Sequence, residues 1–88
     1  MSELEVLVGE NCPICKGYLT RLALDGIKPK TVSLDTPLGK QIEKEFHIHK
    51  VPAIQIVRYE ADGKRTVLRT SIGEFSPRWL NAALKKYT

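Results

Sequence analysis

Short apolar runs alternate with stretches of helical periodicity along the chain, and together they predict four strands and three helices. The first strand is expected at 4–8 (LEVLV), a run of β-favouring residues that ends at Gly9. The runs 31–35 (TVSLD) and 51–59 (VPAIQIVRY) predict the second and third strands. A fourth strand at 65–70 (RTVLRT) follows an Asp-Gly turn signal, so it should pair with the third strand as an antiparallel hairpin.

The three helices are predicted from prolines that suit the first helical position and from apolar residues at helical spacing. The first helix should begin at Pro13 and stop at Asp25-Gly26, while Thr36 and Ser76 should cap the second and third at their N-termini. The residues expected on the buried faces are Cys15, Leu19 and Leu22 in the first helix, Leu38, Ile42 and Phe46 in the second, and Leu80, Ala83, Leu84 and Tyr87 in the third, with Phe75 stapled to Leu80.

The predicted order of elements is β-α-β-α-β-β-α, which belongs to the α/β class. A βαβ unit requires parallel first and second strands joined by a right-handed crossover, and the hairpin adds two antiparallel strands beside them. We therefore expect a single domain, 1–88, with a four-stranded mixed sheet flanked by helices on both faces.

Composition and charge narrow the classes of function. The chain has 88 residues, of which 42% are hydrophobic and 27% charged, as in an ordinary soluble domain. A formal charge of +4 is spread along the chain and aromatic residues make up only 7%, so no nucleic-acid surface is expected, and Tyr18 and Trp79 should instead pack in or near the core. The apolar runs are too short to span a membrane and MSELEV lacks signal-peptide character, so we expect a cytoplasmic protein, and a monomer.

The only two cysteines lie in the segment 11–15, NCPIC. Cys12 is expected at the N-terminus of the first helix, where free amide groups and the helix dipole stabilise a thiolate, and Cys15 lies one turn later. A mixed disulfide formed at Cys12 can then be resolved by Cys15. A purely structural disulfide is disfavoured in a reducing compartment, and its short loop would remove little chain entropy. The pair therefore predicts catalytic redox cysteines.

A zinc-binding or protein-interaction module is the alternative for the same pair. Zinc sites of this kind need four ligands, and the chain has no second cysteine pair. Only His47 and His49 could complete a site with Cys12 and Cys15, but they would point to opposite faces if their segment were a strand. We expect both histidines at the surface, between the second helix and the third strand.

In these motifs the whole chain resembles the glutaredoxin and thioredoxin superfamily. CPIC is similar to the Cys-Pro-Tyr-Cys of glutaredoxins, and Val51-Pro52 before the third strand is similar to their second motif. The resemblance implies a thioredoxin fold and a small dithiol-disulfide oxidoreductase. It also implies a cis Val51-Pro52 bond beside the cysteines, substrate docking at the backbone of Val51, and substrate contacts at Pro13, Ile14 and Pro52.

The chain departs from the glutaredoxin pattern at several positions. Glutaredoxins usually have a basic residue before the first cysteine, an aromatic residue between the cysteines, Thr-Val-Pro, and a Gly-Gly-x-Asp-like segment that holds glutathione. Here the corresponding positions include Glu10, Ile14, Lys50 and the segment 71–74 (SIGE). Other groups that could serve glutathione are Lys16, Lys50 and Arg69 for its carboxylates and Glu74 for its amine.

The segment 71–80 (SIGEFSPRWL) is instead similar to the Ser-Gly-Phe-x-Pro segment of small redoxins that donate electrons to ribonucleotide reductase. Thioredoxin reductase recharges those redoxins. We therefore expect no bound cofactor beyond a redox-active Cys12–Cys15 disulfide, and protein disulfides as substrates, with ribonucleotide reductase among them. The external reductant is expected to be a thioredoxin-reductase system or glutathione.

Overall fold

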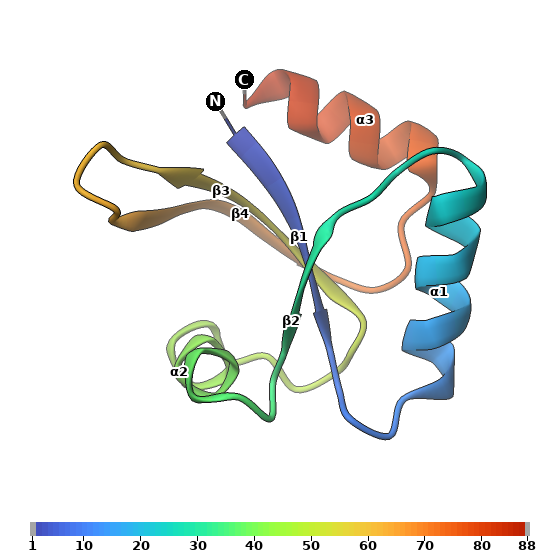
Figure 1. Cartoon of the computed structure of the whole chain (residues 1–88), viewed down its shortest axis with the longest axis horizontal. Helices are drawn as coiled ribbons and strands as arrows, with labels where there is room; N and C mark the ends of the chain where they lie inside the picture. Colours follow the sequence, from blue (N-terminus) through green and yellow to red (C-terminus); the bar gives the residue numbers. More distant parts are fainter. Residues whose placement is uncertain (1, 88) are drawn as a thin grey trace.

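One mixed sheet of four strands forms the centre of the molecule (Figure 1). The structure is a computed structural model, and it describes residues 2–87. The elements are β1 (Ser2–Val8), α1 (Pro13–Leu24), β2 (Lys30–Ser33), α2 (Pro37–Phe46), β3 (Ala53–Tyr59), β4 (Arg65–Ile72) and α3 (Pro77–Lys86). Their order confirms the predicted β-α-β-α-β-β-α arrangement. Within the described part of the chain, no helix has the length and apolar character needed to cross a membrane.

The strands lie in the order β2-β1-β3-β4. β1 and β2 are parallel, whereas β1 pairs with β3, and β3 with β4, in antiparallel register. A bulge at Leu68 and Arg69 sets two residues of β4 opposite Ile56 of β3. The side chain of Leu68 packs against the apolar cluster under α3, and the guanidinium of Arg69 lies over the ring of Trp79 in α3. The predicted mixed sheet and its hairpin are therefore confirmed.

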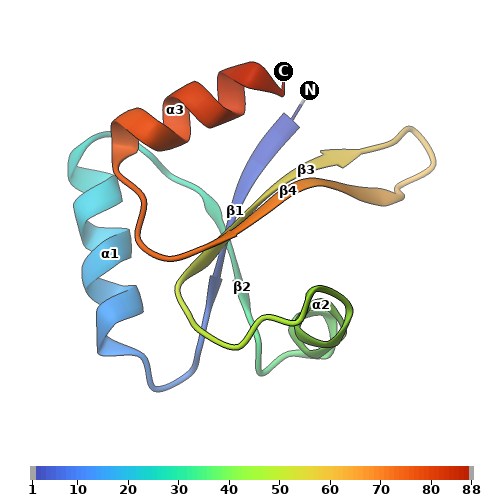
Figure 2. The ribbon, with the colours of Figure 1, turned by 180° about the vertical axis from the view of Figure 1, so that it is seen from behind.

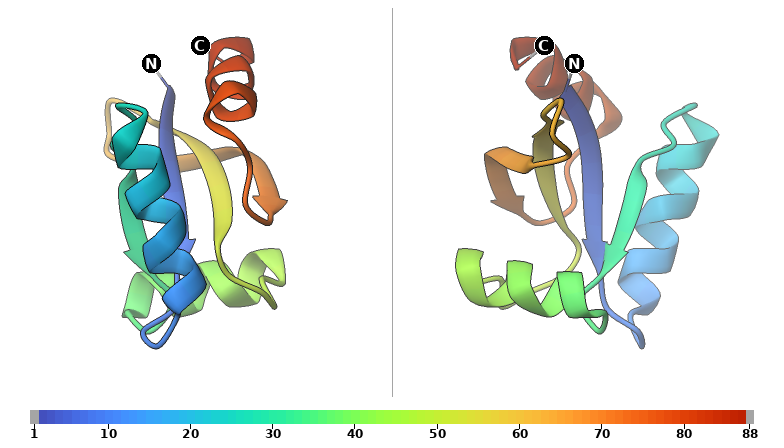
Figure 3. Two further views of the ribbon diagram at one scale, coloured as in Figure 1. Left: turned by 90° about the vertical axis from the view of Figure 1, so that its right-hand side faces the viewer. Right: turned by 60° about the vertical axis from the view of Figure 1, so that its left-hand side comes forward.

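Two apolar clusters cover the two faces of the sheet. On one face Leu4 and Val6 of β1 and Ile54 and Ile56 of β3 meet α1 and α3. The helical partners in this cluster are Tyr18 and Leu22 of α1 and Leu80 and Ala83 of α3. On the other face the members are Leu7, Val32, Leu34, Ile42, Ile48 and Ala53, with Ile42 contributed by α2. Figure 3 shows α1 and α2 on opposite sides of β1 and β2. The alternation of side chains along β1 thus separates the two clusters.

Several predicted boundaries and contacts are wrong in detail. β2 runs from Lys30 to Ser33, so it ends two residues before the predicted boundary, although the N–H of Leu34 still donates to the carbonyl of Val8 in β1 at 2.8 Å. Leu38 is 42% exposed rather than buried, because α2 approaches β2 at Gly39 instead. A Cβ on Gly39 would lie only 1.9 Å from the carbonyl oxygen of Ser33, so the neighbouring side chain turns outward. In α1, Tyr18 is buried while Leu19 is half-buried.

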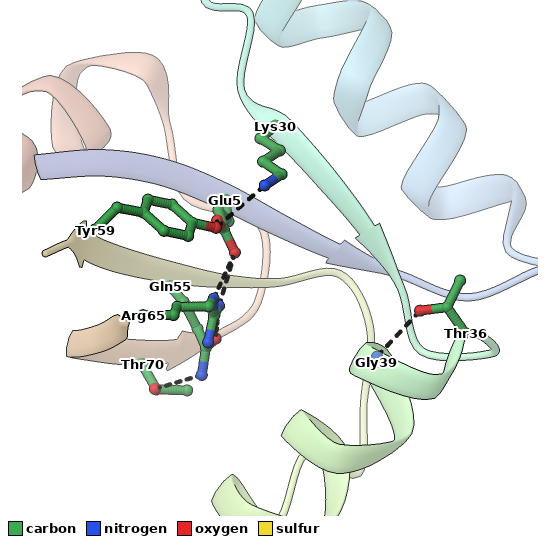
Figure 4. A network of polar contacts seen from close by, with 8 residues as sticks. All are labelled: Glu5, Lys30, Thr36, Gly39, Gln55, Tyr59, Arg65 and Thr70. Carbon is green, nitrogen blue, oxygen red and sulfur yellow. Dashed lines mark hydrogen bonds and ion pairs between the residues drawn. The ribbon is translucent and has the colours of Figure 1, made fainter. Parts of the chain in front are cut away.

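A polar network lies on the sheet face opposite α1 and α3 (Figure 4). Glu5 and Gln55 are fully buried there. Arg65 donates to Oε1 of Glu5 at 2.7 Å and to Oε1 of Gln55 at 2.6 Å, while Gln55 donates to Thr70 at 3.0 Å. The hydroxyl of Tyr59 donates to the second carboxylate oxygen of Glu5. Each buried polar group therefore has a partner, as burial of charge requires.

Candidate active site

The two cysteines lie at the N-terminus of α1 and form a disulfide, with 5.2 Å between their Cα atoms. Cys12 is the N-cap of the helix and Pro13 occupies its first turn, as predicted. Sγ of Cys12 accepts the backbone N–H of Cys15 at 3.1 Å. The sulfur of Cys12 therefore lies where a backbone N–H of the first turn and the positive end of the helix dipole stabilise a thiolate.

The two sulfur atoms differ in accessibility. Cys12 is half-buried and lines a surface depression with Asn11, Pro13 and Lys16. Cys15 is only 2% exposed. Cys12 is thus the more accessible member of the pair, and the buried Cys15 is within bonding distance of its sulfur.

The loop before β3 lies next to this pair. The Val51–Pro52 peptide bond is cis, which confirms the geometry implied by the resemblance. A Cβ placed on Gly9 would be 3.4 Å from Cγ2 of Val51 and 3.8 Å from Cβ of Cys12, so Gly9 lies between these two predicted site residues. The Pro52 carbonyl accepts the N–H of Gly73 at 3.0 Å, which brings the segment after β4 to the same place.

The predicted substrate contacts surround Cys12 to different degrees. Pro13 and Ile14 are exposed in the first turn of α1, and the side chain of Ile14 is 59% accessible. Val51 is half-buried and Pro52 is buried, with its carbonyl already bonded to Gly73. Of these predicted contact residues, Pro13 and Ile14 are therefore the most accessible and Pro52 the least.

A groove of about 340 Å³ opens between the loop before Cys12, the N-terminal part of α2 and the loop before β3. Its charged lining residues are Glu10, Asp35, Glu43, Lys40 and Lys50, and His49 also contributes to it. Over residues 2–87 none of these side chains forms an ion pair. The groove thus carries three carboxylates against two lysines.

Of the side chains that could have served glutathione from other directions, two are held by other contacts and two lie near Cys12. The guanidinium of Arg69 lies 4.9 Å from the ring centroid of Trp79, and its Nε donates to Ser71 at 3.2 Å. Glu74 forms an ion pair with Arg21 of α1 at 3.0 Å. Lys50 lines the groove and Lys16 the depression at Cys12.

The alternative zinc ligands are not brought together. His47 is the C-cap of α2 in the left-handed region, with φ 53°, so its segment is not the strand considered in the sequence prediction. Both His47 and His49 are exposed, as expected. Among residues 2–87 no three Cys, His, Asp or Glu side chains are grouped as metal ligands, so the histidines do not join Cys12 and Cys15.

Two contacts at the site were not predicted from the sequence. Asp35, expected at the end of a strand, lies in a loop, and its Oδ2 accepts the N–H of Glu10 at 2.8 Å, two residues before Cys12. The hydroxyl of Tyr18 bonds to both backbone groups of Phe75. A buried tyrosine signals that its hydroxyl needs a partner, but the identity of the partner depends on tertiary structure.

No protein-family model matches the chain, and no curated protein matches it either. Among solved structures, a thioredoxin from Thermus thermophilus superposes with a TM-score of 0.68 at 19% identity, over 98% of this chain and 72% of that chain. The chain has a thioredoxin-like fold.

Two further thioredoxin-like structures agree. Trxlp from Edwardsiella tarda gives a TM-score of 0.61 at 26% identity, over 94% of this chain and 81% of that chain. A thioredoxin from Malassezia sympodialis gives a TM-score of 0.60 at 20% identity, over 97% of this chain and 73% of that chain. This thioredoxin-like fold, with a Cys-x-x-Cys disulfide at the start of its first helix, suggests thiol–disulfide chemistry.

Proposed function

We propose that this protein is a small dithiol-disulfide oxidoreductase that reduces disulfides of other proteins in the cytoplasm, acting as a monomer. The observation that carries the proposal is the asymmetry of the pair: Cys12 is accessible at the helix N-terminus, whereas Cys15 is 2% exposed. Such an arrangement assigns attack to Cys12 and resolution to Cys15.

The reaction proceeds in two exchange steps. The Cys12 thiolate attacks one sulfur of the target disulfide, the target S–S bond breaks, and the released thiolate takes up a proton. Cys15 then loses its proton and attacks the Cys12 sulfur, which releases the second target thiolate. The target gains two electrons and two protons, and the chain is left with the Cys12–Cys15 disulfide. No bound cofactor is needed, because the two sulfurs carry both electrons.

Substrate docking is assigned to the surface around Cys12. The side chains of Pro13 and Ile14 are exposed beside it. Gly9 lies between Cys12 and Val51, and a Cβ placed on Gly9 would be within 3.8 Å of both side chains. We assign the backbone of Val51 and the cis Pro52 to the positioning of the target chain, in line with the resemblance to glutaredoxins and thioredoxins.

A thioredoxin-reductase system is the proposed electron source, in preference to glutathione. Glutathione has two carboxylates, and a like charge at 4 Å costs about 1 kcal/mol in water and more near a protein surface. The groove beside Cys12 carries three carboxylates against two lysines. Arg69 is held over Trp79, and Glu74 is paired with Arg21. The proposed targets are protein disulfides, with that of ribonucleotide reductase among them.

A coupled assay tests both the activity and the reductant. NADPH oxidation is followed with insulin, and in parallel with a ribonucleotide-reductase disulfide, in the presence of either thioredoxin reductase or glutathione with glutathione reductase. We expect faster turnover with thioredoxin reductase, and none by Cys12→Ser. Turnover with the glutathione system alone would reverse the choice of reductant, and no turnover with either system would remove the proposed activity.

A further inference from the structure

The hydroxyl of Tyr18 binds a backbone segment that is distant in sequence. Tyr18 lies on α1, three residues after Cys15, and its side chain is only 1% exposed. Its hydroxyl donates to the carbonyl of Phe75 at 2.7 Å and accepts the N–H of the same residue at 3.2 Å. One side-chain oxygen therefore satisfies both backbone groups of Phe75.

The segment that Tyr18 binds connects to the loop before β3. Residues 73–76 link the end of β4 to α3 and pass beside α1 (Figure 2). The N–H of Gly73 donates to the carbonyl of Pro52 at 3.0 Å, and Ile72 is paired with Ala53. Tyr18 thus joins α1, which carries Cys12, to the segment that lies against Val51–Pro52.

We propose that Tyr18 is a positioning residue that fixes segment 73–75 as part of the surface on which the target protein docks. This inference rests on the proposed function. Hydrogen bonds anchor the backbone of this segment at two residues, Phe75 to the Tyr18 hydroxyl and Gly73 to the Pro52 carbonyl. The Glu74–Arg21 ion pair is a further side-chain contact, and it is exposed to solvent. Loss of the Tyr18 hydroxyl leaves the backbone of segment 73–75 with the hydrogen bond at Gly73 and removes the two bonds at Phe75.

The hydroxyl is suited to this task because it stays protonated. Burial raises the pKa of Tyr18, so the group acts as donor and acceptor at once over the working range. The N-terminus of α1 is bonded independently, through Cys15 N–H to Cys12 Sγ. Loss of the hydroxyl should therefore disturb binding of a protein substrate and leave the chemistry of Cys12 unchanged.

Tyr18→Phe removes the hydroxyl and keeps the ring in the core. Tyr59→Phe is the matched control, because it removes a hydroxyl that donates to the buried Glu5, in the network on the opposite sheet face. Both variants are assayed for KM and kcat with insulin, for reduction of cystine as a small disulfide, for alkylation of Cys12, and for stability in urea.

We expect Tyr18→Phe to raise KM for insulin by roughly fivefold, because substrate binding must then order a segment that has lost about one net hydrogen bond, while kcat, the cystine rate and Cys12 alkylation change less than about twofold. Tyr59→Phe should lower stability and leave KM for insulin unchanged. An unchanged KM in folded Tyr18→Phe, or an equal rise in Tyr59→Phe, overturns the inference.

A second measurement does not depend on the folding of Tyr18→Phe. In the mixed disulfide of Cys15→Ser with a target peptide, the backbone amide resonances of 73–75 should shift, whereas those of the hairpin turn 60–64 should not. Unmoved amides at 73–75 would contradict the inference. Failure of the proposed function can be distinguished from failure of this inference, because the wild-type chain would then reduce neither insulin nor cystine. In that case the inference would fall with the proposed function.

Discussion

Arg65→Met should destabilise the protein far more than removal of an arginine from the surface. Arg65 is the cationic partner of Glu5, with 2.7 Å between Nη2 and Oε1, and the side chains are 14% and 0% exposed. The substitution keeps an unbranched apolar side chain and deletes the charge. It leaves the buried carboxylate of Glu5 with the Tyr59 hydroxyl alone, and the Oε1 atom of Gln55 without its donor.

The size of the effect follows from this burial. Removing one partner of a buried ion pair costs about 3 to 5 kcal/mol, a large share of the roughly 5 to 15 kcal/mol by which a small domain is stable. The pair Arg21–Glu74 is the control, because it has a similar length of 3.0 Å but side chains that are 58% and 42% exposed. Arg21→Met should therefore cost only about 0 to 1 kcal/mol.

Urea denaturation at neutral pH, followed by circular dichroism, measures these free energies of unfolding. The double variant Glu5→Leu with Arg65→Met should recover most of the loss, because it removes the unpaired carboxylate as well. A loss in Arg65→Met no larger than that in Arg21→Met would refute the reasoning, since it would show that water reaches Glu5.

Three further outcomes are expected. Cys15→Ser should accumulate mixed disulfides with target proteins while Cys12→Ser should not, as non-reducing electrophoresis would show; equal trapping by both variants would contradict the assigned roles. Gly17→Ala should stabilise the protein by about 0.5 to 1 kcal/mol in urea denaturation, because nothing lies within 4 Å of the added Cβ in α1. Gly39→Ala should instead cost about 1 to 3 kcal/mol of stability, because its Cβ would lie 1.9 Å from the carbonyl oxygen of Ser33 in β2. Reduced Cys12 should be alkylated more slowly in Asp35→Ala than in Asp35→Asn, because both variants lose the carboxylate but only Asn keeps an acceptor oxygen for the N–H of Glu10. Equal rates in the two Asp35 variants would contradict this role.

Local signals in the sequence were sufficient to predict where the helices begin. The hydroxyls of Thr36 and Ser76 accept the N–H groups of Gly39 and Trp79, as N-caps do. These contacts span three residues, so the sequence contains both partners within one turn. The same reasoning placed Cys12 at the start of α1, and the order of elements then limited the sheet to few topologies.

Contacts between distant segments could not be predicted in this way. Glu5 lies in an apolar run, which signals that a buried carboxylate needs a partner, but Arg65 is 60 residues away and meets it only through the register of β3 and β4. The outward direction of Leu38 depends likewise on how closely Gly39 approaches β2. The cis geometry at Val51–Pro52 came from the family resemblance rather than from local physics.

Single-turnover electron transfer tests most directly whether Cys12 and Cys15 act as a dithiol reductant. The fully reduced chain is freed of external reductant, mixed with excess insulin, quenched with acid and analysed by mass spectrometry. We expect one insulin disulfide to be reduced per chain, and the chain to lose two hydrogens with Cys12 linked to Cys15. A chain that keeps both thiols, or that transfers electrons equally well as Cys12→Ser, would contradict the proposed function.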